Sequence, residues 1–323
     1  MKRLVGLLGA LLFSALAAWA PAQAQSYPSR PIRLVVPWPP GTPGDVVGRV
    51  LGEHMGKQLG QAVVVDNKPG AFGTVGLSDA QRQPADGYTL YMLAAPATLL
   101  APVLLPAQKS DVGTLEPVGL AAWSYNVLAT AVASPLRSPE DIVAAAKARP
   151  GALSFPSGGN GTPAHIAGEM FKLERGLQIV HVPYNQFPLA INDLISGRID
   201  FMFLTSAAAI PQMAGGKLRG MATTGAKRLS ALPDVPTMTE LGFHDFVVRG
   251  FEMITAPAGT PREVIDKLNA ALNAAVRSPE VKERLDKLGL ETEAMTPAQA
   301  RATLVAEQAA LLKVARTIGL KAD

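Results

Sequence analysis

The chain has 323 residues, of which 48% are hydrophobic and 17% are charged, and its formal net charge is +4. This balance excludes a disordered chain, and the length suits two domains of roughly 100–200 residues each. No long Lys/Arg run or basic stripe interleaved with aromatic residues is present, which argues against a nucleic-acid-binding protein. Cysteine is absent, so disulfides and thiolate metal sites are excluded.

The N-terminal segment has the pattern of an export signal. Lys2 and Arg3 precede an apolar stretch over residues 4–19, and a small-residue A-x-A motif ends at Ala24. These features predict a signal peptide over residues 1–24 that is cleaved after Ala24, with an uncleaved membrane anchor as the alternative. No later segment has about 18 unbroken apolar residues. We therefore expect a soluble mature chain in the periplasm.

The rest of the chain alternates short apolar runs with helical stretches. An apolar stripe with helical spacing covers residues 46–59 and is stopped by Gly60. A strand on either side of it, with short links, predicts a parallel βαβ unit and an α/β fold. The last 60 or so residues are expected to be mostly helical. Strands are predicted over residues 32–36, 62–66, 88–94, 126–132, 152–155, 178–182, 199–203 and 218–223.

Several helix starts can be recognised from a hydroxyl residue followed by proline. Four of these pairs begin at Ser138, Thr260, Ser278 and Thr296, and each first turn also carries an acid or an amide. Such pairs predict an N-cap hydroxyl with proline at the first helical position. The acid or amide complements the helix dipole or closes a capping box.

A fifth start, at Thr162, differs because its first turn carries His165 and no acid. The preceding loop, residues 157–161, reads SGGNG and is rich in small residues. An open helix N-terminus behind such a loop favours an anion-binding site. The alternative is a tight strand-to-helix turn whose amides bind water.

Motifs of the common enzyme and nucleotide-binding classes are absent. There is no G-x-S-x-G, no G-x-x-x-x-G-K-[ST], and no G-x-G-x-x-G after the first strand. The four histidines lack H-x-x-x-H spacing, so we expect neither a metal nor a cofactor. An exported hydrolase using Ser157 or Asp45 with His165 is an alternative, but no clear third residue would orient the base.

Several stretches together resemble one family, over essentially the whole mature chain from Tyr27 to Asp323. That family is the Bug receptors, the periplasmic solute receptors of tripartite tricarboxylate transporters. The stretches are YPSRPIRLVVPWPPGTPGD, NKPGAFGTVG, PADGYTL, SGGNGTPAHIAGEMFK, IVHVPYN, DLISGRIDFMF, GKLRGMATTGAKRLSALPDVPTMTELGF and APAGTPREVIDKLNAALNAAV.

The resemblance implies an α/β, two-lobed periplasmic binding-protein fold of type II-like architecture. Each lobe has a central β-sheet flanked by helices, and the ligand lies in the cleft between the lobes. Lobe 1 is expected to comprise residues 27–124 plus 249–323, and lobe 2 residues 125–248. Two strands then cross the waist as a hinge, about which the lobes close.

The resemblance also implies a function, that of a non-enzymatic receptor for a small organic carboxylate. Backbone amides, hydroxyls and bridging water hold the ligand, and a monomeric receptor delivers it to integral membrane permease subunits. A receptor that feeds a sensor kinase is the alternative. The candidate ligand-binding residues are Trp38, Pro40, Gly41, Thr42, Gly44, Asp45 and Ala95 in lobe 1, and Ser157, Gly158, Asn160, Gly161, Thr162, His165 and Thr205 in lobe 2.

The stretch PWPPGTPGD, residues 37–45, departs from the family pattern. Thr42 and Pro43 stand where glycines are usual, so this loop is expected to be stiffer and one amide donor poorer. Asp45 is expected to cap its own helix, and further roles for it are to order a bridging water or to select a ligand amino group. Which carboxylate is bound stays open.

Overall fold

The computed structural model describes residues 27–106, 111–184 and 186–320. The predicted signal peptide lies outside these residues. In chain order the elements are β1 (Ile32–Val36), α2 (Pro43–Leu59), β2 (Val63–Asn67), η1 (Ala71–Gly73), α3 (Thr74–Gln81), β3 (Thr89–Ala95), α4 (Ala97–Leu104), η2 (Val112–Thr114), β4 (Leu115–Ala131), α5 (Pro139–Ala148), β5 (Ser154–Ser157), α6 (Pro163–Arg175), β6 (Val180–Pro183), α7 (Phe187–Ile195), β7 (Met202–Thr205), α8 (Ser206–Ala214), β8 (Leu218–Thr223), β9 (Arg249–Pro257), α9 (Arg262–Arg277), α10 (Pro279–Asp286) and α11 (Pro297–Thr317).

The sequence predicted the first βαβ unit correctly. β1 pairs in parallel with both β2 and β3, and four of its five residues are buried, Arg33 being the exception. A strand that is covered on both faces is a nearly continuous apolar run, as IRLVV is apart from Arg33. α2 begins at Pro43, three residues before the predicted start, and it ends at Gly60 in the left-handed conformation.

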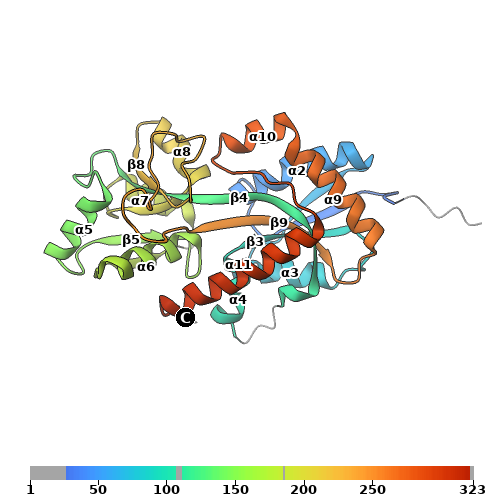
Figure 1. Cartoon of the computed structure of the whole chain (residues 1–323), viewed down its shortest axis with the longest axis horizontal. Coiled ribbons are helices and arrows are strands. Elements are labelled where there is room, and N and C mark those ends of the chain that lie inside the picture. Colours follow the sequence, from blue (N-terminus) through green and yellow to red (C-terminus); the bar gives the residue numbers. More distant parts are fainter. Residues whose placement is uncertain (1–26, 107–110, 185, 321–323) are drawn as a thin grey trace, which may run out of the picture.

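Two long strands connect the two lobes, as Figure 1 shows in the middle of the molecule. The large sheet has the strand order β2-β1-β3-β9-β4-β7, with β8 also paired to β4. β9 lies antiparallel between β3 and the first half of β4, while the second half of β4 pairs with β7 and β8. β5 and β6 form a separate parallel pair. The fold is therefore an α/β, two-lobed one, and the division at residues 125 and 249 stays a prediction.

Helices cover both faces of the sheet in the first lobe. α2 and α9 pack on one face, where Leu51 and Leu268 share a core with Ile254 of β9. α3, α4 and the first part of α11 lie on the other face with Phe251 and Met253. Two of these helices also reach the second lobe, because side chains of α4 and of the end of α11 join its aromatic core.

The hydroxyl–proline helix starts agree only partly with the predictions. Ser138 and Thr296 each form a complete capping box, as expected. Thr260 does not cap α9, because its hydroxyl donates to the Pro257 carbonyl and the helix begins at Arg262. Ser278 lies at the N-cap of α10 without a side-chain hydrogen bond to the helix. Within the described ranges, no helix has the length and apolar character needed to cross a membrane.

Candidate functional site

Two loops of the structure begin their helices in the same way. We call residues 37–45 the first loop and residues 157–165 the second loop. The tripeptide Gly-Thr-Pro occurs three times, at the starts of α2 and α6 and just before α9. The N-cap residues Thr42 (φ −75°, ψ 160°) and Thr162 (φ −71°, ψ 158°) have nearly the same backbone angles. The preceding glycines are both left-handed, with φ of 81° and 73°.

The threonine hydroxyls of both loops bond to their own loop and not to the helix. Thr42 Oγ1 donates to the Pro39 carbonyl at 2.8 Å, and Thr162 Oγ1 donates to the Gly159 carbonyl at 2.7 Å. Neither helix start has a side-chain cap. In the described part of the chain, the first-turn amides of Gly44, Asp45 and Ala164 have no acceptor. Both helices therefore present free N–H groups and a positive dipole end.

A first-turn side chain holds the loop glycine in each case. The Gly41 amide donates to Asp45 Oδ2 at 2.9 Å, and the Gly161 amide donates to His165 Nδ1 at 3.1 Å. The Asp45 carboxylate thus accepts from the amide of Gly41, the residue before the N-cap. In a capping box it would accept from the amide of the N-cap residue Thr42. His165 does in α6 what the carboxylate does in α2, which explains why the second start needs no acid.

Charged and amide groups hold the first loop in place. Asp45 is 2% exposed and also accepts from Arg49 at 2.9 Å and from Asn67 Nδ2 at 2.9 Å. Asn67 Nδ2 also donates to the Trp38 carbonyl at 2.8 Å. Burial alone would raise the pKa of Asp45, but the bonds from Arg49, Gly41 and Asn67 outweigh it and lower that pKa. Because both carboxylate oxygens are engaged, Asp45 positions the loop.

A hydroxyl and two imidazoles hold the second loop. Ser157 is fully buried, and its Oγ lies 2.7 Å from His181 Nε2 and accepts from the Gly159 amide at 3.0 Å. The rings of His165 and His181 stack at 4.2 Å between centroids. The sequence paired Ser157 with His165 for a hydrolase, whereas the imidazole on the serine hydroxyl is that of His181. The hydroxyl is sealed inside the loop by these contacts.

Glycines allow both loops to pack closely. A Cβ at Gly44 would lie 2.7 Å from Trp38 Cδ1, so only a glycine here lets the indole pack this closely against the first turn of α2. A Cβ at Gly161 would lie 2.5 Å from Leu104 Cδ1 at the end of α4. The second loop therefore touches a helix of the first lobe.

The remaining candidates lie at loop tips and strand ends. Pro40 and Gly158 are exposed and Asn160 is half-buried. Ala95 is the last residue of β3 and Thr205 the last residue of β7, where it pairs with Asn126. The Thr205 hydroxyl oxygen is buried and has no hydrogen-bond partner among the described residues.

The sequence missed two residues that shape the first loop, Asn67 and Arg49. Asn67 directly follows the strand predicted over residues 62–66, and Arg49 lies on the exposed side of α2. The Gly-Thr-Pro tripeptide was a usable signal but not a specific one, because a third copy at residues 259–261 precedes α9, which begins at Arg262. Its partners Asp45 and His165 stand at equivalent positions.

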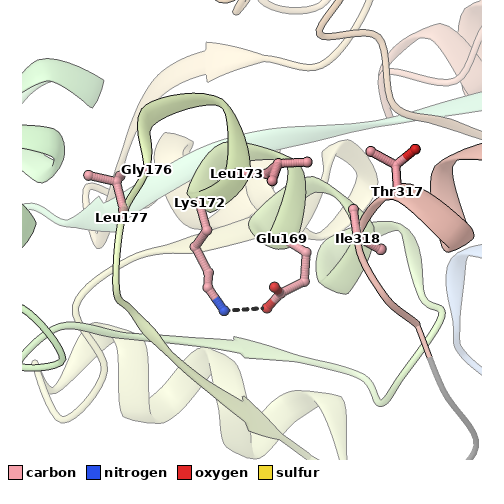
Figure 2. A pocket seen from close by; sticks show the side chains of 7 residues that line it. All are labelled: Glu169, Lys172, Leu173, Gly176, Leu177, Thr317 and Ile318. Carbon is pink, nitrogen blue, oxygen red and sulfur yellow. Dashed lines mark hydrogen bonds and ion pairs between the residues drawn. The ribbon is translucent and has the colours of Figure 1, made fainter.

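Neither of two surface pockets is lined by residues of these loops. Figure 2 shows one between α6 and the end of α11, where Lys172 Nζ lies 2.7 Å from Glu169 Oε1. The other lies where Ile210 of α8 and Ser230 approach α10. The candidate site therefore rests on the two helix starts.

Comparison with known proteins identifies the family. Residues 47–319 match the model of the tripartite tricarboxylate transporter family receptor. The chain is 35% identical over 323 residues to protein BugT of Bordetella pertussis, with 99% of each chain covered. It is 31% identical to the structure of the periplasmic binding protein BugD, at a TM-score of 0.81, covering 92% of this chain and 100% of that one. An R. palustris protein solved with adipate is 29% identical, at a TM-score of 0.86 and with the same coverage. The chain belongs to the Bug family of tripartite tricarboxylate transporter receptors.

Proposed function

We propose that this protein captures a small organic carboxylate in the periplasm and delivers it to integral membrane permease subunits. The carboxylate lies between the first and second loops, which the two lobes bring together on closure. The observation that carries this proposal is the pair of open helix starts, whose amides have the same arrangement in both lobes. The relative solved with adipate supports the ligand class.

Amide donors suit reversible capture of an anion. An N–H to carboxylate bond is charge-assisted and strong, and each helix start adds about half a positive charge. No cationic side chain has to lose its water to make the site, which avoids the large desolvation cost of a buried ion pair. The ligand is therefore held firmly and can still be released to the permease.

The loop side chains would mainly position these donors. The single proton of the Thr42 hydroxyl is used on the Pro39 carbonyl, and that of Thr162 on the Gly159 carbonyl. The prolines of the first loop restrict its backbone, which lowers the ordering cost of binding. Water bridging the Thr42 and Thr162 oxygens to the ligand would complete the coordination.

A thermal-shift screen tests the ligand class. It compares mono-, di- and tricarboxylates, amino acids and neutral sugars. A ligand at one hundred times its Kd stabilises the folded protein by about 2.7 kcal/mol. Carboxylates are expected to raise the melting temperature and sugars to leave it unchanged. A shift with sugars and none with any carboxylate would contradict the proposal.

Aspartate placed at each N-cap tests the site itself. In the Thr42→Asp and Thr162→Asp variants, the new carboxylate can accept from the first-turn amides. We expect ligand affinity to fall at least about 100-fold in each, with stability kept or raised. Thr296→Asp is the matched control, because it makes the same change at a capped helix start elsewhere. Unchanged affinity in the two loop variants would place the site elsewhere.

A further inference from the structure

A buried carboxyl group lies on the strand that joins the lobes. Glu252 is in the middle of β9 and is 9% exposed. Its Oε2 atom has no hydrogen-bond partner among the residues that the structure describes. A buried acceptor without a partner costs stability, so a group that supplies the missing donor would be bound favourably.

Glu252 faces the side of the sheet that α2 covers. Alternate residues of a strand point to the same face, and Ile254 and Ala256 of β9 join the core formed with α2 and α9. Ala122, the residue opposite Glu252 on β4, belongs to the same core. The carboxyl group therefore lies on the α2 side.

The strand register places Glu252 at the level of the first loop. A Cβ at Gly48 of α2 would contact Val36 and Met92, and Met92 pairs with Ile254. Two residues earlier in β9, Glu252 pairs with Ala94, about 7 Å closer to the carboxyl ends of β1 and β3. One turn earlier in α2, about 6 Å in the same direction, is Gly44. Glu252 thus lies level with the open start of α2.

A second buried oxygen without a described partner lies on the same face, in the other lobe. Ser124 and Asn126 of β4 alternate with Ala122, the residue opposite Glu252, and Thr205 pairs with Asn126. The unpartnered oxygens of Glu252 and Thr205 therefore lie on opposite sides of β4, next to the row of side chains that runs from Ala122 to Asn126. Thr205 is itself a candidate ligand-binding residue, which connects Glu252 with the ligand space.

No described cation offsets the charge of Glu252. Its neighbours across the sheet are the alanines Ala94 and Ala122. The cations of α2 and β9 that are closest in sequence to this region are paired with other acids, Arg49 with Asp45 and Arg249 with Glu307. Burial raises the pKa of Glu252 to about 7, so the group is poised between its two forms at neutral pH.

We infer that Glu252 determines specificity by binding a protonated amino group of the ligand. The ligand would then be an amino carboxylate, with its carboxylate on the two loops and its ammonium group on Glu252. This inference rests on the proposed function. An ammonium group supplies both the donor and the positive charge that the site lacks. A second ligand carboxylate there would meet a like charge unless Glu252 kept its proton.

Matched pairs of compounds test the inference by isothermal titration at pH 7. The pairs are glutamate and glutarate, aspartate and succinate, and 6-aminohexanoate and adipate. In the wild type, the amino member of at least one pair should bind at least about tenfold more tightly. Glu252→Gln keeps the side-chain shape and should abolish that preference. Glu116→Gln changes a carboxyl on β4 that pairs with Arg301, and it should retain the preference.

Proton release gives a second readout. Binding of an ammonium group favours ionised Glu252, so the heat of binding should depend on the ionisation enthalpy of the buffer in the wild type and not in Glu252→Gln. Equal or tighter binding of the amino-free members, unchanged by Glu252→Gln, would overturn the inference and leave the proposed function intact. Failure of every carboxylate to bind would overturn both.

Discussion

The first and second loops share a backbone arrangement but hold it by different means. Both begin a helix with Gly-Thr-Pro, and both bond the glycine amide to a side chain of the first turn. In the first loop that side chain is Asp45, paired with Arg49 and Asn67. In the second loop it is His165, which is neutral because its Nδ1 atom accepts the bond. The open helix start is thus the common feature, and the side chains that support it can differ.

The loops also differ in what surrounds them. A Cβ at Gly41 would meet nothing within 4 Å, whereas one at Gly161 would meet Leu104 at 2.5 Å. The second loop therefore depends on packing against α4 of the first lobe. The first loop is held by the Gly41–Asp45 bond and by hydrogen bonds from Arg49 and Asn67.

Alanine at the two glycines should separate backbone strain from packing. Gly41→Ala and Gly161→Ala both place a side chain in the left-handed region, which costs about 1 kcal/mol. Gly161→Ala also crowds Leu104, which adds about 2 kcal/mol. We expect urea unfolding to show a loss of about 3 kcal/mol at Gly161 and about 1 kcal/mol at Gly41. Equal losses of unfolding free energy in the two variants would mean that α4 shifts at no cost to accommodate the new methyl group.

Asparagine at the two supporting positions should test the contrast between charged and neutral groups. Asp45→Asn loses charge-assisted bonds and turns an amide towards Arg49, for a cost of about 2 kcal/mol. His165→Asn can keep the bond from Gly161 but loses the ring stacking with His181, for about 1 kcal/mol. Urea unfolding measures the loss of stability in both variants. A larger loss in His165→Asn than in Asp45→Asn would contradict the expected order.

The pH dependence of stability provides a further test of the charged support that Asp45 gives to the first loop. Because the pKa of Asp45 is lowered in the folded protein, its contribution is present above the ordinary value of 3.8 and is lost as the pH falls through the folded pKa. The difference in stability between the wild type and Asp45→Asn should therefore shrink below about pH 4. A difference that stayed constant down to full protonation would show that the charge of Asp45 does not support the loop.

The fold could be predicted where the chain is locally regular. β1, β2, β3 and β8 were found within one residue, because they are short apolar runs between clear breakers. The first half of β4 and all of β9 were not named from periodicity. Bulges near Pro117 and Ala122 interrupt the alternation of β4, and both strands are buried on two faces. The resemblance predicted that two strands cross between the lobes, without naming which strands they are.

The two loops of the candidate site could be predicted from the sequence, but the side chains from other elements that hold them in place could not. The Gly, Thr and Pro residues carry local turn chemistry that the sequence shows directly. Asn67 reaches the first loop from the end of β2, and His181 reaches the second loop from within β6. Glu252 was missed because a lone acid in an apolar run has no motif. Its importance depends on burial, which only the fold reveals.

The amide protons of Gly44 and Ala164 provide the most direct test of the two-loop grip. Their NMR signals can be followed while the protein is titrated with the carboxylate that gives the largest thermal shift. If both helix starts donate to the carboxylate, both amide protons should move downfield together, in proportion to the bound fraction. Saturation of the ligand site with both signals unmoved would contradict the account.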